Sequence, residues 1–242
     1  MAALQARVAQ AARVCVLTGA GMSAESGIPT FRDAQSGLWA RFDPMQLASE
    51  EGFRADPRLV WDWYAQRREG VRRAQPHAGH VALADFARRR PGVLTVITQN
   101  VDDLHQRAGL LGTIRLHGDI LQDQWLSPSR HAPACDLAQA VPGRPPRCAL
   151  CGNLVRPGVV WFGESLPHGA WQAAEQAAQA CAVMLVVGTS GVVWPAAGLA
   201  AAARRSGAHV VIINPAATEI DGDAHEHLAG PAAELLPKLL MR

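Results

Sequence analysis

The chain has 242 residues, of which 49% are hydrophobic and 18% charged, and its formal net charge is +2. This apolar content is enough to bury a core, which argues against a disordered chain. The nearly balanced charge argues against nucleic acid and an anionic membrane as obligatory partners.

Residues 1–13 place apolar side chains at helical spacing without a continuous apolar block, so we expect a capping helix and no secretory signal. The most apolar later segment, residues 192–203, is interrupted by Pro195 and Gly198 and is too short to span a bilayer. We therefore expect a cytoplasmic protein. The five cysteines are an odd count for a disulfide framework, and Cys15 and Cys181 are expected to be small buried side chains.

Strand-like apolar runs recur along the chain, and alanine-rich helical patterns lie between several of them. The runs cover residues 14–17, 93–98, 113–116, 183–187 and 209–213. Short, almost wholly apolar strands that alternate with helices are typical of a parallel sheet covered on both faces. We therefore expect a Rossmann-like α/β fold, which binds ligands at the carboxyl ends of its strands.

Two insertions interrupt this alternation. Residues 39–79 are rich in Trp, Arg and Glu at helical spacing, with Pro44 and Pro57 at expected helix starts. Residues 119–158 carry many prolines and three cysteines. We expect the two insertions to form a smaller domain, with the binding site in the crevice beside the sheet. The sheet domain then comprises residues 1–38, 80–118 and 159–242.

Three polar segments follow apolar runs and are expected to converge. Gly19 and Gly21 come after the first run, where glycine lets backbone N–H groups approach a pyrophosphate without a Cβ in the way. Residues 99–102 follow the second run, and His117 follows the third. A glycine-rich turn alone is a weak signal, but this combination indicates a dinucleotide whose ribose is altered chemically.

His117 is the candidate catalytic residue. A lone histidine is more often structural, but this one stands before Gly118 at a strand end and follows a polar loop. A neutral imidazole can accept a proton from a sugar hydroxyl at physiological pH, which defines a general base. His105 lies in an expected helix and is interpreted as structural.

The chain resembles the sirtuin family of NAD-dependent protein deacylases from about residue 14 to residue 240. Five motifs in the family's order carry the resemblance: GAGMSAESGIPTFR, TQNVDDLH, LHG, RPGVVWFGE and VVGTSGVVWPAA. The resemblance implies that NAD is consumed as a co-substrate. The acyl group of a protein lysine then passes to ADP-ribose as nicotinamide is released.

The resemblance also implies a set of NAD contacts. They are Gly19, Ala20, Gly21, Ala24, Glu25, Ile28, Pro29, Phe31, Arg32, Gln99, Asn100, Asp102, Gly188, Thr189, Ser190, Asn214 and Ala232. The alternative interpretation of residues 188–190 is an ordinary turn. Where the family often has an acidic residue two positions after the asparagine, this chain has Ala216, so a contact to the adenosine ribose differs.

Tyr64 and Arg67 stand three residues apart, which places them on one helix face. A guanidinium pairs with a terminal carboxylate through two hydrogen bonds. The pair resembles the Tyr-x-x-Arg signature of sirtuins that remove malonyl, succinyl or glutaryl groups. It implies a desuccinylase or demalonylase, with deacetylation as a secondary activity. The alternative is a solvated arginine beside a core tyrosine.

Residues 159–164 are expected to form an edge strand that pairs with an extended substrate peptide. Val160 and Phe162 would then line the tunnel for the acylated lysine of the partner protein. The alternative is a plain core strand.

The resemblance implies a structural zinc site of two Cys-x-x-Cys pairs, but the chain keeps only Cys148 and Cys151. Cys135 and His131 would complete a Cys₃His set, since a structural zinc needs four ligands. The alternative is that zinc has been lost and that Trp125 and the proline-rich loop pack in its place. In both cases the metal would be structural.

Other functions remain open to the sequence. A nicotinamide-dependent oxidoreductase normally has an acidic residue about twenty positions after its glycines, whereas this chain has a Trp-rich insertion there. A non-catalytic NAD-binding module would not need His117, Asn100 and Asp102 together. ADP-ribosyl transfer to protein would use the same ribose carbon.

Overall fold

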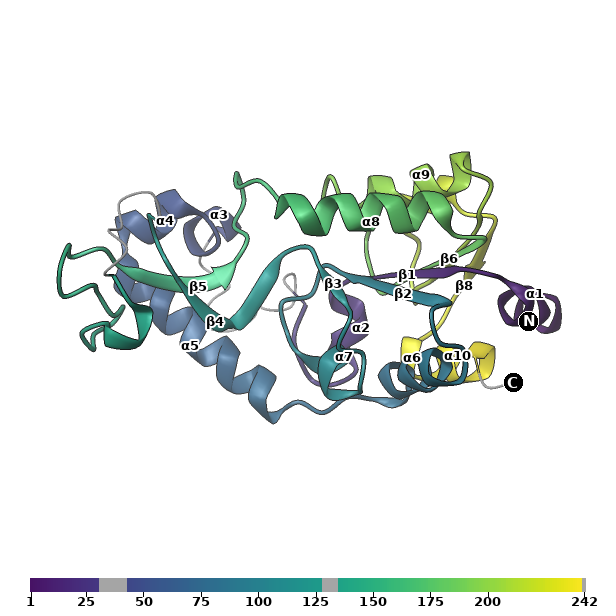
Figure 1. Cartoon of the computed structure of the whole chain (residues 1–242), viewed down its shortest axis with the longest axis horizontal. Coiled ribbons are helices and arrows are strands. Elements are labelled where there is room, and N and C mark those ends of the chain that lie inside the picture. Colours follow the sequence, from purple (N-terminus) through teal and green to yellow (C-terminus); the bar gives the residue numbers. More distant parts are fainter. Residues whose placement is uncertain (31–42, 128–134, 241–242) are drawn as a thin grey trace.

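The computed structural model describes residues 1–30, 43–127 and 135–240. Within these residues, six parallel strands form one sheet in the order β3-β2-β1-β6-β7-β8 (Figure 1). Their bounds are β1 (Val14–Thr18), β2 (Leu94–Thr98), β3 (Ile114–Arg115), β6 (Val183–Val187), β7 (His209–Ile213) and β8 (Glu226–Leu228). The chain passes from β1 to β2 and β3 on one side and continues to β6, β7 and β8 on the other. The strand order therefore reverses between β1 and β6.

Helices cover both faces of this sheet (Figure 1). One face carries α1 (Ala2–Gln10), α6 (Ala78–Arg89) and α10 (Ala232–Leu240), and the other carries α8 (His168–Ala180) and α9 (Gly198–Arg205). In β1, Val14 and Val16 pack into the first core, while Cys15 and Leu17 pack into the second. Successive side chains of a strand point to opposite faces, so an entirely apolar strand serves two cores. The predicted doubly covered α/β sheet is confirmed.

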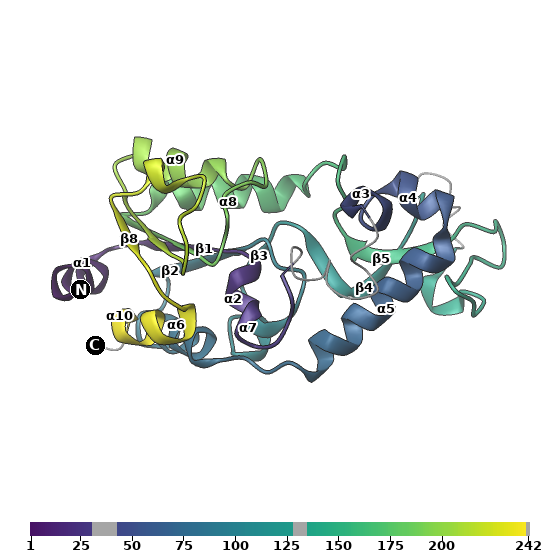
Figure 2. The same cartoon turned by 180° about the vertical axis from the view of Figure 1, so that it is seen from behind.

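A smaller antiparallel sheet lies beside the parallel one (Figure 2). It pairs β4 (Gly118–Trp125) with β5 (Val155–Val159) and lies near α3 (Pro44–Leu47), α4 (Glu50–Ala55) and α5 (Pro57–Arg73). A third core joins these elements, with Phe53 and Trp63 from the first insertion packed with Ile120 and Trp161. The Arg68 side chain also connects α5 to β4, donating to the Ile120 carbonyl at 2.6 Å and pairing with Asp123 at 2.6 Å.

The helix starts in the first insertion follow the predicted punctuation. Pro44 and Pro57 are the first residues of α3 and α5. The Asp43 and Asp56 side chains accept hydrogen bonds from backbone N–H groups in the first turns. Proline has no N–H to leave unsatisfied at a first helical position, and aspartate caps the groups that remain.

Short elements complete the described chain. They are the helices α2 (Ala20–Ala24) and α7 (Leu104–Arg107) and the 3-10 helices η4 (Leu137–Gln139) and η5 (Asp221–Asp223). Among the described residues, no helix combines the length and the apolar character needed to cross a membrane.

Candidate functional site

The predicted polar segments meet where the carboxyl ends of β1, β2 and β6 lie side by side. We call this side of the parallel sheet the sheet edge. Thr18, the last residue of β1, pairs in register with Thr98 at the end of β2 and with Val187 at the end of β6. The segments after these strands therefore leave the sheet side by side. This edge lies where the strand order reverses, which is the usual ligand position in open α/β sheets.

Three glycines let two of these segments touch. A Cβ on Gly21 would lie 2.8 Å from Gly188 Cα, and a Cβ on Gly188 would lie 2.3 Å from the Met22 nitrogen. The Gly19 N–H donates to the Val187 carbonyl at 3.0 Å, and the Gly21 N–H donates to the Gly188 carbonyl at 2.7 Å. These two N–H groups are therefore engaged within the protein. Contact between the loops requires glycine at these positions, and the expected approach of this segment to a pyrophosphate stays a prediction.

Asn100 and Asp102 are buried and share Ser23 as a partner. Asn100 Nδ2 donates to Ser23 Oγ at 2.9 Å and to the Gly19 carbonyl at 2.9 Å, and the Ser23 hydroxyl donates to Asp102 Oδ2 at 2.8 Å. Burial raises the pKa of Asp102, while hydrogen bonds from the Leu104 N–H and from Ser23 lower it. The sequence analysis did not single out Ser23, although it stands in the same motif as Gly19 and Gly21.

Arg115 holds the loop that carries these side chains. Its guanidinium donates to the carbonyls of Val101 at 2.9 Å and Asp102 at 2.8 Å, and it pairs with Asp119 at 2.7 Å. The sequence analysis missed this residue. The available signal was a charged side chain inside an otherwise apolar predicted strand.

Gln99 connects the end of β2 to the loop after β6. Its side-chain nitrogen donates to Thr189 Oγ1 at 3.2 Å, and its backbone N–H donates to the Thr18 carbonyl at 2.9 Å. Residues predicted from separate motifs are therefore joined by direct contacts across β1.

Gln99 fixes the tautomer of the neutral His117 ring. The distance from His117 Nδ1 to the Gln99 carbonyl oxygen is 2.8 Å. A carbonyl only accepts hydrogen bonds, so Nδ1 carries the proton and the neutral ring keeps its lone pair on Nε2. Burial lowers the pKa of His117, and the bond to Gln99 opposes this effect. The ring is therefore neutral at physiological pH, as a general base requires.

Two buried histidines lie behind this site. The Thr18 hydroxyl donates to Thr98 Oγ1 at 2.8 Å and lies 3.0 Å from His105 Nε2. The centre of the His80 ring is 5.0 Å from that of His105. Burial lowers the pKa of His105 to about 4 and that of His80 to about 2. Both rings are therefore neutral, and His105 supports the end of β1 as expected of a structural residue.

Tyr64 and Arg67 lie on one face of α5. The guanidinium carbon of Arg67 is 4.7 Å from the centre of the Trp63 ring and 5.8 Å from that of the Tyr64 ring. Buried Tyr64 accepts a hydrogen bond from Trp161 Nε1 at 2.9 Å. Burial lowers the pKa of Arg67, while Tyr64 and Asp102 raise it. Arg67 is thus close enough to Asp102 for the two charges to interact.

Arg67 differs from its neighbours on the helix in its partners. Arg68 and Arg72 pair with the carboxylates of Asp123 and Glu69. Across residues 1–30, 43–127 and 135–240, no carboxylate pairs with Arg67 and no hydrogen bond engages its guanidinium. Burying a cation without a partner is costly, so this position favours an anion.

The segment after β5 does not form the predicted edge strand, because its chain turns at Glu164. The Glu164 carboxylate accepts the Trp161 N–H at 2.8 Å and pairs with the Arg156 guanidinium, which lies over the Trp161 ring at 3.4 Å. These contacts close a turn, and the strand ends at Val159. The pattern of apolar residues in the sequence could not predict this turn, because the turn depends on contacts of the Glu164 side chain.

Val160 and Phe162 take different positions on that turn. The Val160 N–H donates to the His117 carbonyl at 2.9 Å, which places this residue next to the candidate base. The Phe162 side chain is exposed, and its N–H donates to the Ala48 carbonyl at 2.9 Å.

The predicted adenosine contacts lie after β6 and β7. Asn214 follows β7, and its side-chain nitrogen donates to the Ala216 carbonyl at 2.7 Å. The Ser190 carbonyl accepts the Glu219 N–H at 3.0 Å. Ala232 is buried at the start of α10.

The remaining predicted NAD contacts lie near α2. Glu25 follows this helix and accepts the Ala233 N–H of α10 at 3.3 Å. Ala20 and Pro29 are exposed, and Ala24 and Ile28 are half-buried. Phe31 and Arg32 lie outside the described residues.

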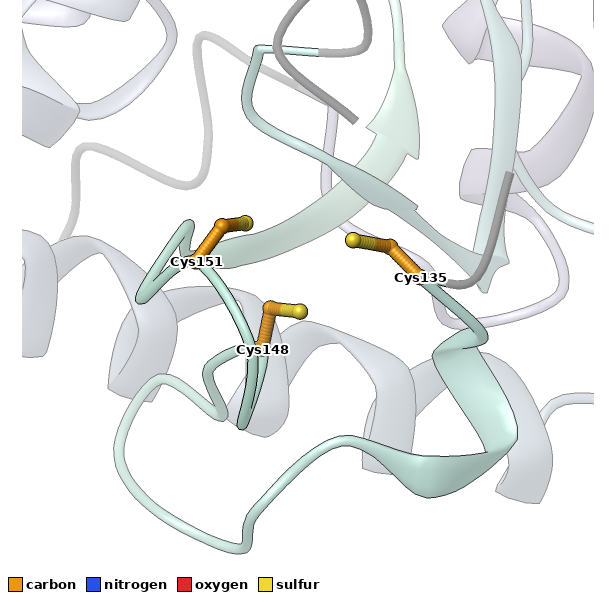
Figure 3. A group of neighbouring side chains, drawn as sticks. All are labelled: Cys135, Cys148 and Cys151. Carbon is orange, nitrogen blue, oxygen red and sulfur yellow. The ribbon is translucent and has the colours of Figure 1, made fainter. Parts of the chain in front are cut away.

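Three cysteines converge at the end of the small sheet (Figure 3). The sulfur atoms of Cys135, Cys148 and Cys151 all lie within 4.8 Å of one another. Backbone N–H groups of Cys151 and Leu150 lower the pKa of the Cys148 thiol. His131, the predicted fourth member, lies outside the described residues. The set of thiols fits a soft or borderline metal such as zinc, whose sulfur ligands in a tetrahedral site lie about 3.8 Å apart.

Comparison with protein families gives one match that covers most of the chain. The model of the Sir2 family matches residues 19–195. The chain is 53% identical over 236 residues to an NAD-dependent protein deacylase of Ralstonia nicotianae, covering 98% of this chain and 94% of the relative. It is 51% identical over 252 residues to an NAD-dependent protein deacylase of Methylococcus capsulatus, with coverage of 98% and 94%.

Solved structures give the same result. The chain is similar to a crystal structure of a Sir2 homologue in complex with NAD, with 42% identity, a TM-score of 0.88, and coverage of 100% of this chain and 93% of that one. It is also similar to a Sir2 protein bound to a propionylated peptide, with 30% identity, a TM-score of 0.84, and coverage of 100% and 97%.

Proposed function

The chain belongs to the Sir2 family and is an NAD-dependent protein deacylase, and we propose that it acts preferentially on lysines that carry an acidic acyl group of the malonyl, succinyl or glutaryl type. The observation that carries this preference is the half-buried Arg67 guanidinium, which has no anionic partner among the described residues.

The sheet edge suits a reaction that depends on positioning. When bound, NAD supplies the ribose carbon to which the acyl oxygen of the substrate bonds as nicotinamide leaves, so that the acyl group ends on ADP-ribose. We assign the NAD contacts to the segments after β1, β2, β6 and β7 named in the sequence analysis. Gln99, Asn100 and Asp102 are held by hydrogen bonds before any ligand arrives. Preorganised polar groups of this kind lower a barrier without reorganising during the reaction.

His117 is proposed as the general base. Its Nδ1 is occupied by Gln99, which leaves Nε2 as the atom that accepts a proton from a ribose hydroxyl. Because burial lowers the pKa of His117, the neutral base is present throughout the physiological range. Asn100 and Asp102 are assigned to substrate positioning beside it.

Tyr64 and Arg67 are proposed to bind the acyl carboxylate. Arg67 would donate two hydrogen bonds to it. The Tyr64 hydroxyl accepts from Trp161 and retains its own proton for donation, and burial raises the Tyr64 pKa, which keeps that proton in place. Val160, next to His117, and Phe162 would line the path of the lysine chain. We assign this pocket to the small domain, which we take to comprise residues 39–79 and 119–158.

The partner is an acylated lysine of a protein. One related Sir2 structure contains a propionylated peptide, and a second structure contains a Sir2 protein with a p53 peptide and NAD. None of the five cysteines, all of which lie in the described residues, forms a disulfide, which supports a reducing compartment, and we infer a cytoplasmic location.

The test is product analysis with matched peptides. Purified protein is incubated with NAD and one peptide carrying acetyl-, malonyl-, succinyl- or glutaryl-lysine, and the products are weighed. We expect nicotinamide, free lysine and acyl-ADP-ribose, with higher kcat/KM for the acidic groups. Faster turnover of the acetyl peptide would contradict the acyl preference. Reduced NAD would indicate an oxidoreductase, ADP-ribosylated peptide a transferase, and NAD binding without turnover a regulatory module.

We also infer that Cys135, Cys148 and Cys151 hold a structural zinc ion. The nearness of the three sulfur atoms and the backbone N–H groups that face Cys148 support this assignment. One zinc per chain is expected by elemental analysis, with loss of zinc and a lower Tm in Cys148→Ser. Cys181→Ser is the control, because Cys181 lies in the sheet core. Zinc-free wild-type protein, or full zinc occupancy in Cys148→Ser, would contradict the inference.

A further inference from the structure

His227 bridges two elements next to the predicted adenosine contact. It lies in β8, where it pairs in register with Ile212 of β7. Its Nε2 is 2.9 Å from the Asn214 carbonyl oxygen, and its Nδ1 is 3.1 Å from Asp221 Oδ2. Both ring nitrogens are therefore engaged at once.

Both partners of the ring only accept hydrogen bonds. A carbonyl oxygen and a carboxylate oxygen have no proton to give, so each ring nitrogen must donate. A neutral imidazole has one N–H, whereas the imidazolium has two. The geometry therefore requires the charged ring. In agreement, the Asn214 carbonyl and then Asp221 raise the pKa of His227 above its ordinary value, against an opposing effect of burial.

The Asn214 backbone is the centre of this arrangement. Its N–H donates to the Leu228 carbonyl at 3.3 Å, and its carbonyl accepts the Gly230 N–H at 3.4 Å in addition to His227. Both distances are long for backbone hydrogen bonds. The bond from His227 is the shortest of the three and the only one that carries charge, so it contributes most to fixing this turn.

Other charged groups near the ring have their own partners. Glu226, on the same strand, pairs with His209 at the opposite end of β7. Arg204 of α9 donates to the carbonyls of Gly222 and Ala224. Within the described part of the chain, Asp221 is thus the charged group in contact with His227.

We propose that His227, as an imidazolium, is a positioning residue for the adenosine half of NAD. It fixes the turn at Asn214 by joining it to β8 and η5. This device lies beside the position where the family often has an acidic residue and this chain has Ala216. The proposal rests on the proposed function, because Asn214 is assigned to NAD on that basis.

The bridge depends on pH in a defined direction. The charged ring is present below the folded-state pKa of His227 and is lost as pH rises through it. The neutral ring can donate to only one of its two acceptors. The lone pair of its other nitrogen then faces an acceptor oxygen. NAD binding should therefore weaken as pH rises, while the chemical step should not change for this reason.

The experiment measures the Kd of NAD by calorimetry and the KM of NAD by turnover, both between pH 6 and pH 8.5. In wild type, we expect both constants to rise about threefold across this range. This change corresponds to the free energy of one lost hydrogen bond. The His227→Gln side chain has one donor nitrogen in place of two and can put it at only one of the two acceptor positions, so we expect constants about fivefold above wild type at pH 6, without the pH dependence and with unchanged kcat. His209→Gln removes a histidine with a carboxylate partner on the same two strands, and it should behave as wild type.

Asp221→Asn keeps the ring and provides a second test. The carbonyl oxygen of the new amide can still accept the hydrogen bonds from Thr218. Its NH₂ group can donate to Nδ1 of a neutral His227 ring, so we expect NAD binding without the pH dependence. Wild-type NAD constants in His227→Gln, or a fall in its kcat at unchanged Kd, would overturn the proposal. Calorimetry needs no turnover, so a protein that binds NAD as expected but yields no acyl-ADP-ribose would contradict the proposed function alone.

Discussion

The sheet edge and the small domain differ in whether their polar side chains have partners within the protein. At the sheet edge, Asn100, Ser23 and Asp102 satisfy one another, and Gln99 holds His117. On α5, by contrast, the Arg67 guanidinium lies over aromatic rings without an anion among the described residues. A hydrogen-bond network that is complete without ligand suits a reaction common to many substrates, whereas a cation without a paired carboxylate suits the choice of one substrate.

The largest expected effect concerns the sheet edge. We expect His117→Ala to lower kcat by about 10² to 10⁴, the usual contribution of a general base. NAD affinity should stay near that of wild type, because the ring acts on a proton and not as the main binding contact. Turnover with an acyl peptide and calorimetry with NAD measure the two effects. His168→Ala, an exposed histidine at the start of α8, is the control. Near-normal turnover in His117→Ala would exclude this base.

The close contact between the loops after β1 and β6 predicts a loss of stability. In Gly188→Ala, the new Cβ would meet the Met22 nitrogen at 2.3 Å and would also require φ near +61°. We expect the free energy of unfolding to fall by about 4 kcal/mol, since backbone must move to relieve the clash. Gly207→Ala has φ +90° with no atom within 4 Å of its Cβ, so it should lose only about 1 kcal/mol from backbone strain. Equal losses in the two variants by urea denaturation would contradict the contact.

The sequence predicted the elements of the sheet better than those of the small domain. The strands at Val183–Val187 and His209–Ile213 coincide with the predicted runs, because both faces of a central parallel strand are buried and its residues are apolar, with His209 at the start of β7 as the exception. β8 was not predicted, since Glu226–Leu228 is a short, half-buried edge strand with polar residues.

The candidate site shows the same division. Residues adjacent in a motif, such as Gln99 and Asn100, were named as candidates from the sequence, and the structure brings them together with His117. Ser23 and Arg115 were missed, because their roles depend on contacts between segments far apart in the chain. The predicted strand after Val159 was wrong for the same reason, since Arg156, Trp161 and Glu164 close a turn that apolar periodicity cannot indicate.

The neutral histidines behind the sheet edge predict acid sensitivity. Burial lowers the pKa of His105 to about 4, while the unfolded chain takes up that proton near pH 6.5. The stabilising contribution is therefore complete above pH 6.5 and is lost as pH falls toward 4. The pKa difference corresponds to about 3 kcal/mol. Urea denaturation at pH 7, 5.5 and 4.5 measures this fall. His105→Gln should show a smaller decrease, and an unchanged pH dependence in that variant would contradict the assignment.

The smallest expected effect is the position of the acid limb of activity. His117 must be neutral to accept a proton, and burial lowers its pKa below 6.5. Activity should therefore fall only as pH drops below about 6.5. A pH profile of kcat at saturating NAD and peptide gives the midpoint, because saturation removes the separate pH dependence expected for the KM of NAD. A midpoint above 6.5 would indicate another essential group or a differently placed ring.

The most direct measurement is the ratio of kcat/KM for a succinyl peptide to that for the matched acetyl peptide, in wild type and in Arg67→Met. The account predicts that this ratio falls by about 30-fold to 100-fold, the worth of a paired carboxylate, while acetyl turnover stays within about twofold. Arg72→Met, the same change on the same helix at an exposed residue paired with Glu69, should leave the ratio unchanged. An equal fall for both peptides in Arg67→Met would contradict the division of roles between the sheet edge and the small domain.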